Sequence, residues 1–235
     1  MSPIRAADEP LPTVRAITKG PHFHWFGYYD KLQFDPGSRY ALGVSNDFQH
    51  RLPTADDGLR LGMVDLEDGD RWISLGDTKC WSWHQTCMIQ WLPGSKEEII
   101  WNDRQGTNMI SHIMNVKTRE KRTLPKAIYC VSPDARWALV NDFARSFSMR
   151  PETGYAGGID PYANELAPAR SGIWRMDLTT GKHELILSLA DLVKIPLRRG
   201  DWSGQKQYID HLLIAPDGKR FAFLERWGKG VGTGF

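Results

Sequence analysis

The sequence has little that would mark a membrane or exported protein. It contains no run of about 18 apolar residues, which a membrane-spanning helix would need. Residues 1–12 lack the apolar stretch of a signal peptide. As it stands, the sequence predicts a soluble, cytoplasmic protein with no membrane partner. An incomplete N-terminus would leave a periplasmic or secreted location open.

The sequence also has few cysteines, and neither positive nor negative charge predominates. The 30 Lys and Arg residues nearly balance 28 Asp and Glu residues, and no basic block of the kind that binds nucleic acid is present. The odd number of cysteines and their spacing argue against a disulfide framework or a zinc site. We expect buried free thiols at Cys80, Cys87 and Cys130. Because no nucleotide-binding motif occurs either, we predict no cofactor and no nucleic-acid partner.

Glycine and tryptophan, in contrast, are abundant, with 22 Gly and 10 Trp residues, a bias that suits turns and an all-β fold. Four segments share an apolar run, a proline-centred turn and a second apolar run, at residues 32–45, 88–101, 129–140 and 211–224. Three of them are followed by a second hairpin, at residues 61–73, 113–124 and 173–187. Each pair of hairpins predicts a four-stranded antiparallel sheet.

A series of such sheets predicts an all-β fold, a β-propeller of four-stranded antiparallel blades. After an N-terminal extension at residues 1–19, we expect a partial propeller domain over residues 20–235, with blades at residues 22–78, 84–125, 126–190 and, incompletely, 208–235. Rings usually close with about four to eight blades, so about three and a half blades predict either a fragment of a longer protein or closure by oligomerisation. The single helix that we expect is short, around residues 188–194.

Blade topology predicts one functional face. The connectors between blades and the loops between the second and third strands emerge on the same face, where long loops usually carry function. The polar and aromatic candidates that these segments bring to that face are His24, Trp83, His84, Asn102, Arg104, His112, Arg145, Arg150, Tyr155 and His211. A divalent metal held by His84 and Gln85 with His24, His112 or His211 is conceivable. The spacing matches no metal motif, however, and we predict none.

Four stretches resemble bacterial propeller proteins related to ulvan lyases and, more distantly, to oligogalacturonate lyases. They are residues 20–31 (GPHFHWFGYYDK), 81–85 (WSWHQ), 101–104 (WNDR) and 150–155 (RPETGY). The resemblance implies a seven-bladed ring and a polysaccharide lyase that cleaves uronate-containing chains by β-elimination. It implies His84, His112 and Tyr155 as acid and base. It also implies an arginine or similar group that neutralises the uronate carboxylate. From their place on the functional face, the substrate-binding residues that we predict are Arg145, Arg150, Arg104, Asn102, His24, Trp83 and His211.

The residue types fit a β-elimination. This reaction implies an acidic polysaccharide or oligosaccharide as the partner. An arginine offsets the uronate carboxylate, and a His or Tyr moves each proton. Two alternatives stay open. A glycoside hydrolase would need paired carboxylates, for which Asp47, Asp103 and Asp142 are candidates. A non-catalytic propeller could instead bind a glycan or a protein on the same face. The sequence leaves the oligomeric state unassigned.

Overall fold

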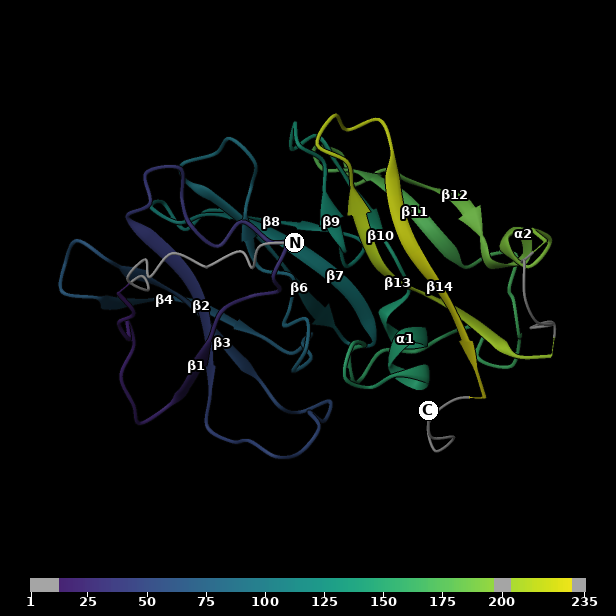
Figure 1. The fold of residues 1–235 in the computed structure, drawn as a ribbon, viewed down its shortest axis with the longest axis horizontal. Coiled ribbons are helices and arrows are strands. Elements are labelled where there is room, and N and C mark those ends of the chain that lie inside the picture. The colour runs from purple at the N-terminus through teal and green to yellow at the C-terminus, as the bar shows by residue number, and fades with distance from the viewer. Residues whose placement is uncertain (1–12, 197–203, 230–235) are drawn as a thin grey trace, which may run out of the picture.

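Three four-stranded antiparallel sheets follow one another along the chain, and a two-stranded sheet comes after them. The structure is a computed structural model that describes residues 13–196 and 204–229. The parts of the predicted N-terminal extension and last blade at residues 1–12 and 230–235 lie outside the described residues. Figure 1 shows the sheets arranged side by side, from purple for the first to yellow for the last. This architecture confirms the predicted all-β propeller built from four-stranded blades.

Within each four-stranded sheet, strands adjacent in the chain pair with each other. The first sheet contains β1 (Phe23–Trp25), β2 (Tyr40–Asn46), β3 (Leu59–Asp65) and β4 (Arg71–Thr78). The second contains β5 (Gln90–Trp91), β6 (Glu98–Gln105), β7 (Asn108–Asn115) and β8 (Lys121–Leu124). The third contains β9 (Cys130–Val131), β10 (Trp137–Val140), β11 (Gly172–Asp177) and β12 (His183–Ser188). The fourth pairs β13 (Lys206–Ile214) with β14 (Phe221–Gly228).

The innermost strands of the first two blades are interrupted. In blade one, β1 pairs with β2 from Phe23 to Trp25, and the chain rejoins the sheet only at Phe34, which forms a bridge with Ala41. In blade two, residues 82–86 make a tight turn just before β5. Because of these interruptions, short segments at the centre of the propeller are not paired in a sheet. Their side chains therefore do not alternate between two faces, as they would in a regular strand.

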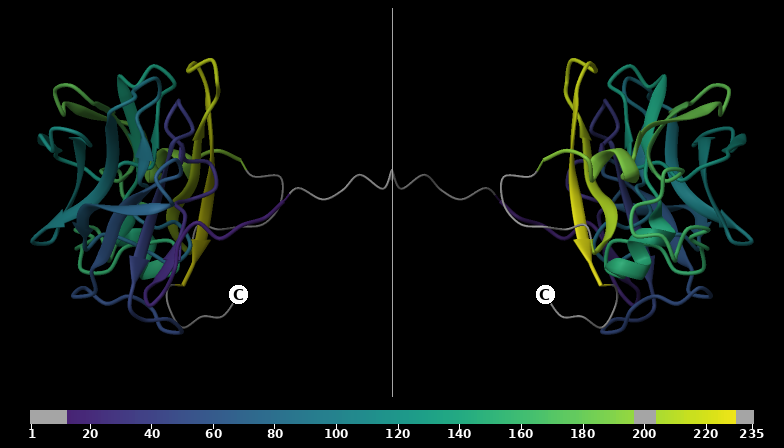
Figure 2. Two further views of the ribbon diagram at one scale, coloured as in Figure 1. Left: turned by 90° about the vertical axis from the view of Figure 1, so that its left-hand side faces the viewer. Right: turned by 90° about the vertical axis from the view of Figure 1, so that its right-hand side faces the viewer.

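The blades are held together by two groups of buried apolar side chains. One joins blades one and two and includes Leu42, Leu61 and Trp91. The other joins blades two, three and four and includes Ile100, Leu139 and Ile209. Full burial of a side chain of this size contributes roughly 1.5–3 kcal/mol. Figure 2 shows the molecule from two sides, with the yellow hairpin of β13 and β14 along one edge of the sheets.

Two short helices accompany the strands. The helix α2 (Leu189–Leu192) falls within the predicted residues 188–194. The helix α1 (Phe143–Met149) was not expected, since we predicted a loop there. It begins where the Asp142 side chain accepts a hydrogen bond from the Arg145 backbone, a normal N-cap, and its Phe143 side is buried. Among the described residues, neither helix is long and apolar enough to cross a membrane.

Candidate functional site

Polar side chains from all four blades meet at the centre of the propeller. Tyr28 lies in the interrupted first strand of blade one, and His84 and Gln85 lie in the turn before β5. Tyr129 directly precedes β9, while Asp210 and His211 belong to β13. Together with two arginines at the rim, they form what we call the axial site: Tyr28, His84, Gln85, Tyr129, Arg150, Asp210, His211 and Arg226.

The buried carboxylate of Asp210 is the centre of the axial site. Its Oδ1 accepts hydrogen bonds from Gln85 Nε2 at 3.0 Å, from the Tyr129 hydroxyl at 3.2 Å and from the His211 backbone at 2.9 Å. Gln85 Nε2 also donates to the Tyr129 hydroxyl at 2.9 Å. Because these donors come from blades two, three and four, Asp210 fixes the inner strands of three blades relative to one another.

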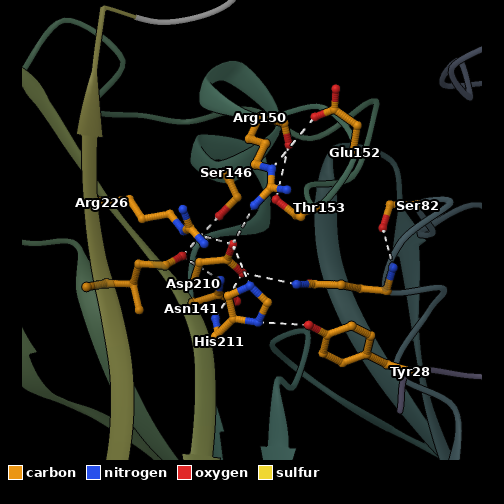
Figure 3. A network of polar contacts seen from close by, with 12 residues as sticks. Tyr28, Ser82, Asn141, Ser146, Arg150, Glu152, Thr153, Asp210, His211 and Arg226 are labelled. Carbon is orange, nitrogen blue, oxygen red and sulfur yellow. Dashed lines mark hydrogen bonds and ion pairs between the residues drawn. The ribbon is translucent and has the colours of Figure 1, made fainter. Parts of the chain in front are cut away.

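The second oxygen of Asp210, Oδ2, faces three cationic or titratable groups (Figure 3). It lies 3.4 Å from Arg226 Nε, 3.6 Å from His211 Nε2 and 3.8 Å from Arg150 Nη1. Asp210 itself is 2% exposed, whereas the Arg150 and Arg226 side chains are 24% and 29% exposed. Asp210 therefore holds two guanidinium groups that remain accessible to an anion from solvent.

His211 has an unusual backbone conformation. Its φ of 51° lies in the left-handed region, at an irregularity in the pairing of β13 with β14. Such a conformation is costly for a residue other than glycine and tends to occur at functional sites. It is maintained because the His211 N–H donates both to Asp210 and to the Tyr129 hydroxyl. In this conformation the imidazole lies beside Tyr28.

A hydrogen bond of 2.8 Å joins the Tyr28 hydroxyl to Nδ1 of His211. Burial raises the pKa of Tyr28, and the nearby Tyr29 and Asp210 act in the same direction. Burial lowers the pKa of His211; Asp210 opposes this shift, whereas Arg226 and Arg150 add to it. Near neutral pH, the phenol is therefore protonated and the imidazole neutral. The Asp210 carboxylate favours a proton on Nε2, so that Nδ1 accepts from the phenol.

His84 and Tyr29 lie at the solvent-exposed edge of the axial site. The exposed His84 ring lies 5.5 Å from the Tyr28 ring and 6.5 Å from the His211 ring, measured between centroids. Tyr29 is 78% exposed, and its ring lies 4.5 Å from that of Tyr28. The His84 backbone N–H donates to the Glu152 carbonyl, which connects this turn to the segment that carries Arg150. The exposed His84 and Tyr29 therefore border the buried Tyr28, which is 5% exposed.

Tyr155 and Asn102 lie elsewhere, in the interior. Tyr155 is fully buried, its ring stacks on Phe143 at 4.1 Å, and its hydroxyl accepts from Asn102 Nδ2 at 3.1 Å. Burial raises the pKa of Tyr155 well above the usual value. The Asn102 amide also pairs with both backbone groups of Ile128. These partners favour a packing role, in which the two side chains fasten blade two to blade three.

His112 differs from the expectation in position. We expected it in a loop, but β6 and β7 are joined by a two-residue turn, and His112 therefore lies inside β7. Its Nδ1 contacts Thr123 Oγ1 at 3.0 Å, and its Nε2 lies 3.3 Å from Asp103 Oδ2. The His112 ring is 7% exposed and packs beside Trp101. None of these partners belongs to the axial site.

Arg145 and Arg104 hold loops in place. Arg145 is 1% exposed, forms an ion pair with Asp160 at 3.0 Å and donates to four backbone carbonyls, those of Tyr162, Glu165, Leu166 and Gln207. Arg104 donates to the carbonyls of Ala55 and Gly106. Both guanidinium groups are thereby occupied by the protein, and the structure gives them a scaffolding role.

Trp83 and His24 lie in an aromatic cluster of blades one and two. The half-buried Trp83 ring lies 5.2 Å from that of Trp25, and its indole N–H donates to the Arg51 carbonyl. The His24 ring lies 5.1 Å from that of Trp72, and burial lowers the pKa of His24. Within the described chain, neither side chain has a hydrogen bond or a ring contact with a side chain of the axial site, although Trp83 directly precedes His84.

Of the residues predicted for the site, the structure brings together His84, Arg150 and His211. Sequence reasoning missed the roles of Tyr28, Gln85, Tyr129, Asp210 and Arg226. The adjacency of Asp210 to His211 was a signal for one of them, because a carboxylate commonly orients a neighbouring imidazole. Tyr28 stands in the aromatic segment 25–29, where nothing in the pattern distinguishes it from Tyr29.

Within residues 13–196 and 204–229, no group of three or more His, Cys, Asp or Glu side chains is arranged to hold a metal ion. Of the histidines considered as ligands beside Gln85, His84 and His211 are close together, at 6.5 Å between rings. His24 and His112 contact other parts of blades one and two.

No protein-family model and no curated protein sequence matches this chain. Among solved structures, it is similar to TolB from Acinetobacter baumannii, with 12% identity and a TM-score of 0.48 over 92% of this chain and 40% of that one. An oligogalacturonate lyase in complex with manganese shows 14% identity and a TM-score of 0.48 over 88% of this chain and 55% of that one. The AtxE2 isopeptidase shows 12% identity and a TM-score of 0.42 over 89% and 37%.

The chain therefore spans about 40% of the length of TolB and 55% of that of the oligogalacturonate lyase. At this similarity, the comparisons say nothing about chemistry. The propeller architecture follows from the sheet topology of the chain itself, and its chemistry must be argued from the axial site. The resemblance to ulvan lyases stays a prediction.

Proposed function

We propose that the protein is a polysaccharide lyase that cleaves uronate-containing glycans by β-elimination at the axial site. The observation that carries the proposal is the hydrogen-bonded pair of Tyr28 and His211, which faces the exposed His84 beside two accessible guanidinium groups. The site thus combines two proton-transfer groups with cations that suit a carboxylate.

The arginines address the main difficulty of the reaction. Removal of the proton next to a uronate carboxylate builds negative charge beside an existing negative charge. Arg150 and Arg226 lie 3.8 Å and 3.4 Å from Asp210 Oδ2, and Arg150 also lies 4.0 Å from Glu152. Both guanidinium groups are partly exposed, so a substrate carboxylate can approach them from solvent. Their charge stabilises the carbanion-like transition state more than the ground state, and this difference accelerates the reaction.

The two proton transfers divide between His84 and Tyr28. His84, at the solvent side, removes the proton from C5 as the C4–C5 double bond forms. The bond from C4 to the glycosidic oxygen then breaks, and the Tyr28 hydroxyl gives its proton to that oxygen. In the resting site, His211 Nδ1 accepts from the phenol and holds it in place, and after the leaving group departs the Tyr28 oxygen takes up a proton from solvent. The proton taken up by His84 returns to solvent, and the reaction needs no oxidant or second substrate.

A glycoside hydrolase would need two neighbouring carboxylates, but within the described chain its three candidates do not contact one another, and each is engaged by other groups of the protein. Asp47 is paired with Arg60 and His22, Asp103 with His112, and Asp142 caps α1. A non-catalytic propeller that binds glycans at the axial site would use the same arginines, and only a product assay distinguishes it from a lyase.

The test is absorbance in the unsaturated-uronate band while the protein is offered a panel of acidic polysaccharides. We expect a rise with at least one uronate polymer. The rise should be lost in His84→Asn and kept in His50→Asn, a matched control at an exposed residue whose φ of 63° suits Asn. New reducing ends without absorbance would instead establish a hydrolase, and binding without any product would establish a binding module.

Arg150→Lys supplies a second, independent readout. An ammonium cannot reproduce the two parallel hydrogen bonds of a guanidinium group to a carboxylate. We therefore expect both a higher KM and a lower kcat, because the uronate carboxylate is bound in the substrate and more strongly in the transition state. Unchanged values of both constants would remove Arg150 from the site.

A further inference from the structure

A cavity of about 540 Å³ lies between blades two and three, apart from the axial site. Its walls come from Gln105 and residues 107–110, from the connector at residues 125–127, and from residues 140–144. The remaining lining residues are Ile159, Pro161, Tyr162, Arg170, Trp174 and His183. No residue of the axial site lines it. Its volume is within the usual range for small-molecule sites, and we call it the inter-blade cavity.

Lys126 places an unpaired cation in this cavity. Its ammonium group lies 4.6 Å above the Trp174 ring and is half-buried. Within the described chain, no hydrogen bond or carboxylate ion pair engages that ammonium. Burial lowers the pKa of Lys126, and the charge of Asp142 in the same cavity opposes this shift. No anion of the described chain contacts the ammonium directly, so a ligand could supply that direct partner.

Arg170 adds a second cation to the same wall. Its guanidinium group lies 4.8 Å above the Tyr162 ring, and no described carboxylate pairs with it. The acidic residue of the cavity, Asp142, is engaged elsewhere: its carboxylate accepts from the Arg145 backbone at 3.0 Å and from Ser171 Oγ at 3.3 Å. With Lys126 and Arg170 against the one carboxylate of Asp142, the lining carries more positive than negative charge, which favours an anionic ligand.

Neutral polar groups stand next to these cations. Gln105, Thr107 and Asn108 line the inter-blade cavity at the turn between β6 and β7. Their side chains make no hydrogen bond to another described residue, so they can donate to and accept from a ligand. Amides and hydroxyls beside a pair of cations match a molecule that carries several hydroxyl groups as well as an acid.

We propose that the inter-blade cavity is a binding site for a hydroxylated organic acid of the size of a hexuronate. The carboxylate of the ligand pairs with Lys126 and Arg170, and its hydroxyl groups bond to Gln105, Thr107 and Asn108. Binding there is independent of turnover at the axial site. The site would hold an acidic sugar unit even if the axial site proved to be non-catalytic.

The test is a titration of the isotope-labelled protein with D-glucuronate, observed at the indole N–H signal of Trp174. This signal, assigned through Trp174→Phe, reports the cavity locally, so ligand at the axial site is not counted. We expect a saturable shift that glucose does not produce. Lys126→Met and Arg170→Gln should each weaken binding at least about tenfold, whereas the exposed control Lys96→Met and the axial variant His84→Asn should leave it unchanged.

Three results would overturn the proposal. They are no shift at millimolar glucuronate, an equal shift with glucose, and binding that both cavity variants leave intact. Arg170 is exposed, so Arg170→Gln remains a valid test if Lys126→Met fails to fold. Loss of the shift in His84→Asn alone would mean that the signal reports the axial site, which also contradicts a separate site.

Discussion

Arg145→Lys tests whether Arg145 supports the scaffold, as its contacts indicate, or binds substrate. Five contacts from three nitrogen atoms join the guanidinium to Asp160 and to the carbonyls of Tyr162, Glu165, Leu166 and Gln207. One ammonium has three donors, so a lysine can keep the Asp160 pair and at most two carbonyls. At least two bonds to a charged donor are lost, each contributing about 1.5 kcal/mol or more. We expect the free energy of unfolding to fall by about 3 kcal/mol.

Urea unfolding followed by tryptophan fluorescence measures this change. Arg136→Lys is the control, because Arg136 is 81% exposed and its carboxylate partner, Asp134, lies in a surface turn; we expect its effect to stay within about 0.5 kcal/mol. A loss below about 1 kcal/mol in Arg145→Lys, together with a large rise in KM for an acidic polysaccharide, would refute the scaffolding role and restore Arg145 as a substrate ligand.

Two further predictions concern titratable groups. A thiol-reactive dye should label none of the three cysteines at pH 8 in the folded protein and all three in urea. The reason is that burial raises the pKa values of Cys87 and Cys130 to about 12 and raises that of Cys80 further. Rapid labelling of the folded protein would contradict this prediction. Because burial lowers the pKa of His211 in the folded state, the unfolded state binds more protons below pH of about 6.5. Stability should therefore fall as the pH drops from about 6.5 toward the lowered pKa of His211, and this fall should be smaller in His211→Gln. Urea unfolding at several pH values measures both effects. An equal fall in the two proteins would exclude His211 as the cause.

The hairpins and their order could be predicted from the sequence because the inner hairpins combine apolar runs with turns at a proline or glycine. The turn at residues 216–218, for example, sits between β13 and β14, where the pattern predicts it. The α1 helix could not be predicted with the same ease. Its signals are an Asp142 cap and one apolar side, and helix formation depends on packing against β13 through Arg145.

The candidate site was predicted less well, for two physical reasons. Sequence position indicates which face of a blade a loop reaches, but not whether a side chain points to the axis or into the core, and Tyr155 points into the core. The interruptions in the innermost strands also break the alternation that a pattern analysis depends on. Tyr28 reaches His211, 183 residues away, only because its strand leaves the sheet.

The central claim is that Tyr28, at the axial site, and not the buried Tyr155, transfers a proton in a β-elimination. It is tested most directly by the turnover of Tyr28→Phe and Tyr155→Phe on a uronate polysaccharide, measured by unsaturated-uronate absorbance. Each variant loses one hydroxyl and keeps its ring. We expect Tyr28→Phe to lower kcat at least about a hundredfold, and Tyr155→Phe to keep kcat within about threefold while it costs about 1 kcal/mol of stability. An unchanged kcat in Tyr28→Phe, or a hundredfold loss confined to Tyr155→Phe, would contradict the assignment of the axial site.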